Sequence, residues 1–261
     1  MKTVCHLILI IVVSGLLGCM GQKKESAMDT RADLRVYGSH RLEAPLTRII
    51  AAFETENGLK VSRELGCGIP KLIPDLKAKQ DGDVLVAGEQ EELKQATDAG
   101  LVASSSTIAW NPFVIVVKKG NPLGIKTPGD LNKPGTRLAL PQPGGGCVSR
   151  LSDQLVATWG LSEPAGRALR NDKGCKSTVG SEMVAKGEVD ATFTWRIVAY
   201  EVAGIEMIPI EKAKGAPCEC FGIIIKGARH PAYAEKFVTY LLSEKAQSIF
   251  CEAGMFDVNE K

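Results

Sequence analysis

The stretch that decides the fold is residues 34–61, which read LRVYGSHRLEAPLTRIIAAFETENGLKV. Its apolar start is typical of a strand that ends at Gly38. Pro45 then opens a run in which apolar side chains recur at helical spacing until Gly58 stops it. Residues 59–65 follow as a second strand. A strand, a helix and another strand in succession predict a parallel sheet with helices packed on its faces.

The same alternation continues along the chain and divides it in two. Further strands are predicted at 83–86, 113–118, 138–140, 191–194 and 220–226, and further helices from Pro70, at 89–99, 148–159 and 177–186, and in the tail at 231–253. The simplest architecture is an α/β protein of two lobes, with parallel sheets and two crossing hinge strands. The expected boundaries are 34–112 plus 226–261 for lobe 1, 119–216 for lobe 2, and 113–118 and 217–225 for the hinge strands.

The N-terminus has the features of a targeting segment. Lys2 precedes an unbroken apolar run that is too short to span a bilayer as a permanent helix. The segment Leu16-Leu17-Gly18-Cys19 resembles a bacterial lipobox, so we expect residues 1–18 to be a lipoprotein signal peptide and Cys19 to carry lipid. Polar residues 19–33 are expected to form a flexible tether. The protein is then extracytoplasmic and lipid-anchored to the bacterial cell membrane; an uncleaved N-terminal anchor is the alternative.

Composition narrows the class of protein. The chain has 261 residues, of which 44% are hydrophobic and 24% charged, which is ordinary for a folded protein with one large domain or two lobes. A formal net charge of +2 argues against a nucleic-acid binder or a general membrane-surface binder. The motifs of serine hydrolases, zinc peptidases, C-x-x-C redox proteins and phosphate-binding loops are absent from the sequence, so no enzyme activity is expected.

Cysteine is plentiful, with eight residues against three histidines. Removal of the signal peptide and lipidation of Cys19 leave six cysteines in the folded part: Cys67, Cys147, Cys175, Cys218, Cys220 and Cys251. An even number outside the cytoplasm allows disulfides, and six cysteines allow 15 pairings. Cys251 falls in the last amphipathic helix, where we expect it to pack inward.

Several stretches, in this order and spacing, resemble one family: residues 34–61, GDVLVAG, NPFVIVVKKGNPLGIKTPGDL, VAKGEVDATFTW and FVTYLLSEKAQSIF. The chain resembles the periplasmic molybdate/tungstate-type (type II) substrate-binding lipoproteins of ABC transporters. The resemblance implies a type II two-lobe fold, an ABC permease as partner, a monomer without cofactor, and an oxyanion held between the lobes by hydroxyl and backbone N–H groups. The number and positions of the cysteines resemble the selenoprotein-associated subgroup that binds heavy metals or organometals.

The resemblance also places the ligand loops. The first falls on Ser39, His40 and Arg41, the second on Gly66, Cys67 and Gly68, the third on Gly146 and Cys147, the fourth on Cys175 and Ser177, and the family's tyrosine on Trp195. Three cysteines therefore map to three cleft loops, and each of them follows a glycine. In the family these positions carry hydroxyl and backbone donors for an anion, so the cysteines mark a departure from its pattern.

The chemistry of thiols favours a different ligand. A helix N-terminus lowers the pKa of a thiol, and thiolates bind soft metals, whereas a thiolate repels an anion. We therefore expect Cys67, Cys147 and Cys175 to hold a thiophilic metal or metalloid species, such as mercuric ion or arsenite, with Cys218 and Cys220 as further candidate ligands. The metal or metalloid would be the transported ligand and not a cofactor.

Three alternatives stay open at this point. A Cys147–Cys175 disulfide beside one buried thiol explains these cysteines without a ligand. A molybdate- or tungstate-like oxyanion uses the hydroxyl and backbone donors of the same loops, Ser177 among them. A thiol–disulfide protein on the same scaffold, acting through Cys218 and Cys220, is the third.

Overall fold

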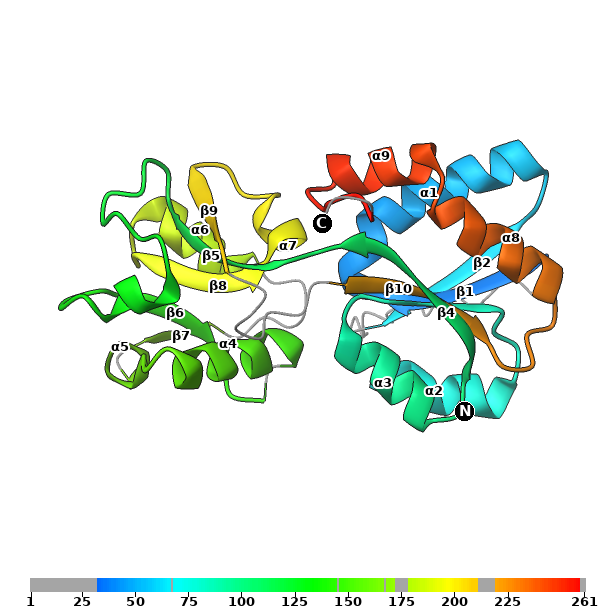
Figure 1. Ribbon diagram of the computed structural model, residues 1–261, viewed down its shortest axis with the longest axis horizontal. Coiled ribbons are helices and arrows are strands. Elements are labelled where there is room, and N and C mark those ends of the chain that lie inside the picture. The colour runs from blue at the N-terminus through cyan, green and yellow to red at the C-terminus, as the bar shows by residue number, and fades with distance from the viewer. Residues whose placement is uncertain are drawn as a thin grey trace, which may run out of the picture.

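The computed structural model describes residues 32–66, 68–144, 146–166, 168–171, 178–210 and 219–258. These residues form two α/β lobes that lie side by side along the long axis of the molecule (Figure 1). Each lobe is built around one sheet, and each sheet has five strands among the described residues. The two-lobe α/β architecture that the sequence predicts is confirmed.

The sheet of lobe 1 has the strand order β2-β1-β3-β10-β4. Its strands are β1 (Leu34–Ser39), β2 (Val61–Gly66), β3 (Val84–Ala87), β4 (Val102–Trp110) and β10 (Glu219–Ile225). β1 pairs in parallel with β2 and β3, whereas β10 runs antiparallel to β3 and β4. The helices around it are η1 (His40–Leu42), α1 (Glu43–Asn57), α2 (Ile69–Lys79), α3 (Gln90–Asp98), α8 (Pro231–Leu241) and α9 (Glu244–Glu252).

The sheet of lobe 2 has the strand order β7-β6-β8-β5-β9. Its strands are β5 (Phe113–Lys118), β6 (Leu138–Pro141), β7 (Leu169–Asn171), β8 (Ala191–Trp195) and β9 (Ile205–Pro209). β6 pairs in parallel with β7 and β8, and β5 runs antiparallel to β8 and β9. The helices of this lobe are η2 (Pro128–Asn132), α4 (Cys147–Thr158), α5 (Ser162–Gly166), α6 (Val179–Lys186) and α7 (Arg196–Ala199).

The decisive stretch of sequence folds as its pattern predicts. β1 is buried along its whole length, and α1 turns one face toward it: Pro45, Leu46, Ile49, Ile50 and Phe53. Gly58 ends α1 with a φ of 65°, a left-handed conformation that glycine adopts without strain. Phe53 packs edge to face on Phe237 of α8, with ring centroids 5.0 Å apart, which fixes the C-terminal helices to lobe 1.

The structure departs from the sequence predictions in several places. The sheets are mixed rather than parallel, because β5 and β10 enter them antiparallel. β4 was not predicted, because its serines face solvent and hide the apolar pattern of a strand. The predicted helix at 231–253 is two helices, because Ser243 caps α9 by accepting a hydrogen bond from the Ala246 N–H at 3.3 Å. The prediction that Cys251 packs inward is wrong, since this residue is exposed on α9.

The chain passes from lobe 1 to lobe 2 at Asn111 and Pro112, which separate β4 from β5. The predicted hinge strands 113–118 and 217–225 correspond to β5 and β10, and each of these strands pairs within a sheet instead of only linking the lobes. Asn111 is buried at the crossing, and its Oδ1 accepts the Ile197 N–H of α7 at 3.1 Å.

A second contact between the lobes lies next to this crossing. Phe256, near the C-terminus, forms a β-bridge with Trp110 at the end of β4. Arg196 of α7 places its Cζ 4.5 Å from the centroid of the Phe256 ring and donates a hydrogen bond to the Gly254 carbonyl. The C-terminal segment of lobe 1 therefore holds the first helical turn that follows β8 in lobe 2.

The N-terminal predictions fall outside the described residues. These are the signal peptide 1–18, the lipidation of Cys19 and nearly all of the tether 19–33. In the part of the chain that the structure describes, no helix is long and apolar enough to cross a membrane.

Candidate functional site

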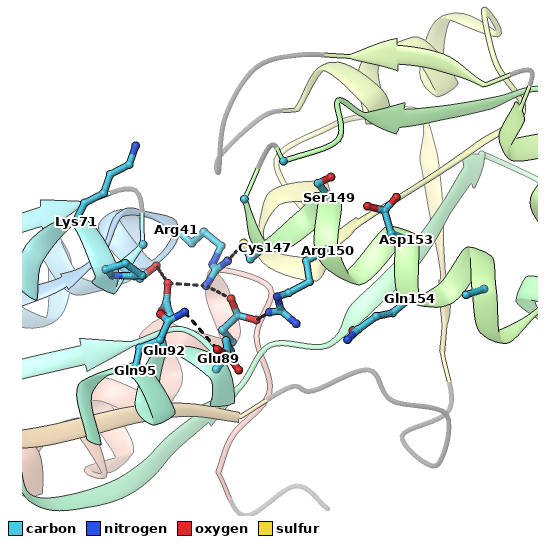
Figure 2. A pocket seen from close by; sticks show the side chains of 17 residues that line it. Arg41, Lys71, Glu89, Glu92, Gln95, Cys147, Ser149, Arg150, Asp153 and Gln154 are labelled. Carbon is cyan, nitrogen blue, oxygen red and sulfur yellow. Dashed lines mark hydrogen bonds and ion pairs between the residues drawn. The ribbon is translucent and has the colours of Figure 1, made fainter. Parts of the chain in front are cut away.

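A cavity of about 780 Å³ lies between the two lobes (Figure 2). From lobe 1 it is lined by residues at or beyond the carboxyl ends of β1, β2 and β3: Ser39, Arg41, Gly68, Pro70, Lys71, Glu89, Glu91, Glu92 and Gln95. From lobe 2 it is lined by the loop after β6 and one side of α4: Gly144, Gly146, Cys147, Ser149, Arg150, Asp153, Gln154 and Ala157. Ligands of open α/β sheets bind beyond the carboxyl ends of the strands, so this cavity is the candidate site.

Arg41 lies where the two lobes meet in the cavity and is only 2% exposed. Its guanidinium Cζ lies 4.8 Å from the Trp195 ring centroid, and its Nη1 donates to the Cys147 sulfur; both partners belong to lobe 2. Its Nη2 lies 3.3 Å from Glu92 Oε1 and 3.7 Å from Glu89 Oε1. Burial by itself lowers the pKa of Arg41. The nearby Glu92, Cys147 and Glu89 together raise the pKa by more than burial lowers it, so the guanidinium stays charged.

The end of β3 is shaped to accept this guanidinium. A Cβ atom on Gly88 would lie 3.0 Å from Arg41 Nη2, so only glycine leaves the space without displacement. The Gly88 N–H donates to Glu92 Oε2 at 2.7 Å, and the Ser39 hydroxyl lies 3.4 Å from Glu92 Oε1. These contacts fix the Glu92 carboxylate, which in turn fixes Arg41.

Glu89 connects the two lobes. Its Oε2 lies 2.6 Å from Arg150 Nη2 on α4, while its Oε1 faces Arg41 (Figure 2). Burial raises the pKa of Glu89, and the two arginines only partly offset this effect. The formal charges of Arg41, Arg150, Glu89 and Glu92 cancel, so helix dipoles and unpaired hydrogen-bond donors decide which sign of charge the inner cavity accepts.

The amino-terminal end of α4 supplies such donors. Gly146, the residue before the helix, has a φ of 85° and offers no side chain to cap it. The first N–H groups of a helix have no partner within the helix, and this end carries the positive end of the helix dipole. Ser149, in the first turn, is 1% exposed, and its Oγ has no hydrogen-bond partner among the described residues. This end of the cavity is therefore suited to an anion.

Cys147 is the first residue of α4, and it carries a free thiol. A position at a helix N-terminus is expected to favour the thiolate, but the pKa of the Cys147 thiol is raised instead. Burial raises the pKa of the Cys147 thiol. The Arg41 guanidinium lowers this pKa, but by less than burial raises it, and Glu89 adds to the rise. The thiol is therefore protonated at neutral pH.

The remaining predicted site residues of the described chain divide into two groups. Ser39, Arg41, Gly68, Gly146 and Cys147 line the cavity. Trp195 is fully buried beneath Arg41, while Gly66, His40 and Cys220 lie beside the cavity without lining it.

His40, Gly66 and Cys220 each make a contact within lobe 1 that needs no ligand. His40 pairs with Glu43 through Nε2 at 3.0 Å. A Cβ on Gly66 would lie 2.8 Å from a Leu72 methyl group, so this glycine admits α2 close to β2. The Cys220 sulfur lies buried 3.6 Å from the Gly88 carbonyl oxygen.

The other predicted ligands, Cys67, Cys175, Cys218 and Ser177, lie outside the described residues. Within the described chain, no group of three or more His, Cys, Asp or Glu side chains is arranged to hold a metal ion. The three-cysteine metal site therefore stays a prediction.

The sequence predictions did not include the two glutamates at the centre of the cavity. Glu89 directly follows Gly88 after strand β3, and Glu92 lies in the first turn of α3. A signal for the glutamates was present, since ligand sites of parallel sheets collect at the carboxyl ends of their strands. Their burial, by contrast, depends on Arg41 and Arg150, and no local pattern reports that pairing.

Comparison with known proteins gives one family. A model described as "Bacterial extracellular solute-binding protein" matches residues 34–256. The molybdate-binding protein ModA of Mycobacterium tuberculosis is 25% identical over 251 residues, which cover 94% of this chain and 94% of that protein.

Solved structures share the fold. The substrate-binding domain of a putative molybdenum ABC transporter from Clostridium difficile is similar with a TM-score of 0.71 and 16% identity, covering 87% of this chain and 99% of that chain. A ferric binding protein from Campylobacter jejuni has a TM-score of 0.72 and 16% identity, covering 87% of each chain. These two proteins share one fold, but their names refer to different ligands. The ligand of this chain therefore has to be inferred from its own site.

Proposed function

Because the chain belongs to the bacterial extracellular solute-binding proteins, we propose that it captures a small oxyanion of the molybdate or tungstate class in the cavity between its lobes. The family implies a small ligand and an ABC permease as partner, and its members bind solutes for transport rather than catalyse reactions. In this proposal the protein acts as a monomer, needs no cofactor, and is held at the membrane by lipid on Cys19.

One observation carries the choice of an anion. The cavity is bordered by the uncapped amino-terminal end of α4, and it holds buried donors without hydrogen-bond partners among the described residues: Ser149 Oγ and Arg41 Nε. A buried donor without a partner costs free energy, which an oxyanion in the cavity would recover. The similarity to a molybdate-binding protein over 94% of the chain supports the same ligand class.

The mechanism follows from the position of the donors. Ser39 and Arg41 come from lobe 1, and Cys147 and Ser149 come from lobe 2. An anion that contacts both groups binds the closed arrangement better than an open one, and this difference in affinity drives closure of the lobes. The closed form is then the one that docks on the permease.

The proposal is tested by titrating the purified, reduced protein with molybdate and tungstate in a calorimeter. Ser149→Ala is expected to weaken binding about tenfold, since a hydrogen bond to a charged group is worth roughly 1.5–3 kcal/mol. Ser152→Ala is the matched control: Ser152 is also buried on α4 with an unpartnered Oγ, but it does not line the cavity. Absence of binding, or equal effects of the two substitutions, contradicts the proposal.

A thiophilic metal or metalloid species is the second candidate ligand. The observation that favours it is Cys147, whose thiol lines the cavity in contact with Arg41. Cys67 is directly followed in sequence by Gly68, another lining residue. A metal that displaces the thiol proton would bind here in spite of the raised pKa of Cys147.

A thermal-shift panel separates the two candidates. Arsenite or Hg(II) raises the Tm of the reduced protein if the second candidate is correct, and Cys147→Ser abolishes that rise, while Cys251→Ser, on the exposed face of α9, leaves it unchanged. Stabilisation by molybdate or tungstate that is unaffected by Cys147→Ser supports the oxyanion and contradicts the thiolate site.

A further inference from the structure

Glu89 places a carboxylate of lobe 1 at the amino-terminal end of α4 in lobe 2 (Figure 2). Its Oε2 lies 2.6 Å from Nη2 of Arg150, the residue whose N–H closes the first turn of α4 on the Gly146 carbonyl at 3.1 Å. Its Oε1 lies 3.7 Å from Nη2 of Arg41, whose Nη1 in turn donates to the Cys147 sulfur in the same turn. The Glu89 carboxylate therefore bridges two cations at the end of the cavity that is suited to an anion.

This carboxylate is held inside the protein at a cost in free energy. The side chain of Glu89 is 3% exposed, yet Glu89 is also one of the residues that line the cavity. Burial raises the pKa of Glu89, and Arg41 and Arg150 only partly offset the rise, so the charged form is less stable here than in water. The cavity of about 780 Å³ beside it has room for the side chain if another anion takes its place.

A ligand anion at this end of the cavity would meet the same two cations. The buried donors on which the proposed site rests are Nε of Arg41 itself and Oγ of Ser149, which directly precedes Arg150 in α4. Two negative charges that lie close together inside a protein repel each other strongly, because little water screens them. Glu89 and the ligand therefore cannot both hold Arg41 and Arg150.

The other buried carboxylate of the charge cluster has a different position. Glu92 Oε2 accepts the Gly88 N–H at 2.7 Å, and its Oε1 lies 3.3 Å from Arg41 Nη2, so these contacts hold it within lobe 1. Of the two glutamates, Glu89 is the one that pairs with a cation from each lobe.

From these contacts we infer that Glu89 is an internal competitor of the ligand: its carboxylate holds the arginines that the anion needs, and the anion binds by displacing it. The inference rests on the proposed function, because it assigns the anion to the same end of the cavity. It adds what sets the affinity, since the anion has to outcompete a carboxylate that is tethered beside the site and is therefore present at a high effective concentration.

Titrations of two variants of this residue test the inference. The full-length, reduced protein and each variant are titrated with tungstate by calorimetry. Glu89→Gln should bind tungstate about tenfold more tightly than the wild-type protein or better, because the anion no longer has to break a buried ion pair. Glu89→Asp keeps the charge but draws the carboxylate back from Arg150 by the length of one C–C bond. Its affinity should lie between those of the wild-type protein and Glu89→Gln.

Glu91→Gln is the matched comparison. It removes the same charge from another residue that lines the cavity, but Glu91 contacts Gln95 Nε2, at 3.3 Å, instead of an arginine. It should raise the affinity for tungstate by no more than about twofold. Equal gains in Glu89→Gln and Glu91→Gln would assign the effect to general repulsion and overturn the inference. Wild-type affinity in Glu89→Asp would overturn it as well.

The remaining outcomes separate this inference from the proposed function. If the wild-type protein binds tungstate and Glu89→Gln binds it no more tightly, the inference fails and the proposed function stands. If neither the wild-type protein nor Glu89→Gln binds molybdate or tungstate, both fail.

Discussion

Arg150 Nη2 of lobe 2 lies 2.6 Å from Glu89 Oε2 of lobe 1, and Glu89 also faces the buried Arg41. This ion pair, together with the contact between Arg41 and the Cys147 sulfur, joins the lobes across the candidate ligand cavity. Closure of the cleft is thus stabilised by the protein's own charges in addition to any ligand. The lobes should therefore separate more readily when this pair is removed.

The first prediction concerns that separation. Arg150→Gln removes the cationic partner of Glu89 and should shift the ligand-free protein toward an open arrangement, which increases the radius of gyration measured by small-angle X-ray scattering. Arg48→Gln is the control, because it removes an ion pair with Glu252 inside lobe 1. An unchanged radius of gyration for Arg150→Gln would show that the cross-lobe ion pair does not hold the lobes together.

The second prediction concerns the stability of the charge cluster. Arg41→Met leaves Glu89 and Glu92 buried without their shared cation, and breaking a buried ion pair costs about 3–5 kcal/mol. The free energy of unfolding, measured by urea denaturation, should fall by about that amount.

A compensating variant makes this result specific. Adding Glu92→Gln to Arg41→Met removes the carboxylate nearest to the guanidinium and should recover part of the loss. If Arg41→Met alone lowers the free energy of unfolding by less than about 1 kcal/mol, the glutamates become hydrated or protonated at little cost in free energy. Their burial predicts the opposite.

The third prediction concerns the second contact between the lobes. Gly254 has a φ of 85°, and a Cβ atom there would lie 2.4 Å from Tyr200 Cγ of lobe 2. Gly254→Ala should therefore cost about 1–3 kcal/mol more than Gly227→Ala, whose φ is 81° but whose Cβ would meet nothing within 4 Å. Thermal unfolding of both variants measures the difference. Equal Tm values would show that the C-terminal segment moves aside freely.

The fourth prediction is a pH dependence in lobe 2. Hydrogen bonds from Arg137, through its side chain and its backbone N–H, lower the pKa of Asp190 below its ordinary value of 3.8. A carboxylate whose pKa is lower in the folded state stabilises the protein above the unfolded-state pKa, and this contribution is lost as the pH falls through the folded-state pKa.

Asp190→Asn should therefore reduce the free energy of unfolding at pH 7 by about 1 kcal/mol or less, because Arg137 is half-exposed and solvent screens the pair. The difference between the two proteins should shrink as the pH is lowered below about 4, in denaturant titrations at each pH. A difference that stays constant down to pH 2 would assign the effect to packing instead of charge.

The fold was largely predictable from the sequence because its central elements are patterned locally. The helix that starts near Pro45 has one apolar face, and Gly58 is a specific stop signal. β4 escaped prediction because its exposed serines give no apolar alternation, and the antiparallel entry of β5 and β10 depends on pairing between segments far apart in sequence.

The candidate site was predictable in position but not in charge. The family resemblance placed the ligand loops on Arg41, Gly68 and Cys147, among others, and all three of these residues line the cavity. The burial of Glu89 and the raised pKa of Cys147 arise only when the lobes meet. Thiol chemistry alone therefore overstated the case for a thiolate site.

The most direct test of the ligand assignment is a crystal structure of the protein grown with tungstate, with anomalous diffraction measured at the tungsten absorption edge. We expect one strong anomalous peak in the cavity, within hydrogen-bonding reach of Ser149 Oγ and the first N–H groups of α4. No peak in the cavity, or a peak only at surface lysines and arginines, would contradict it.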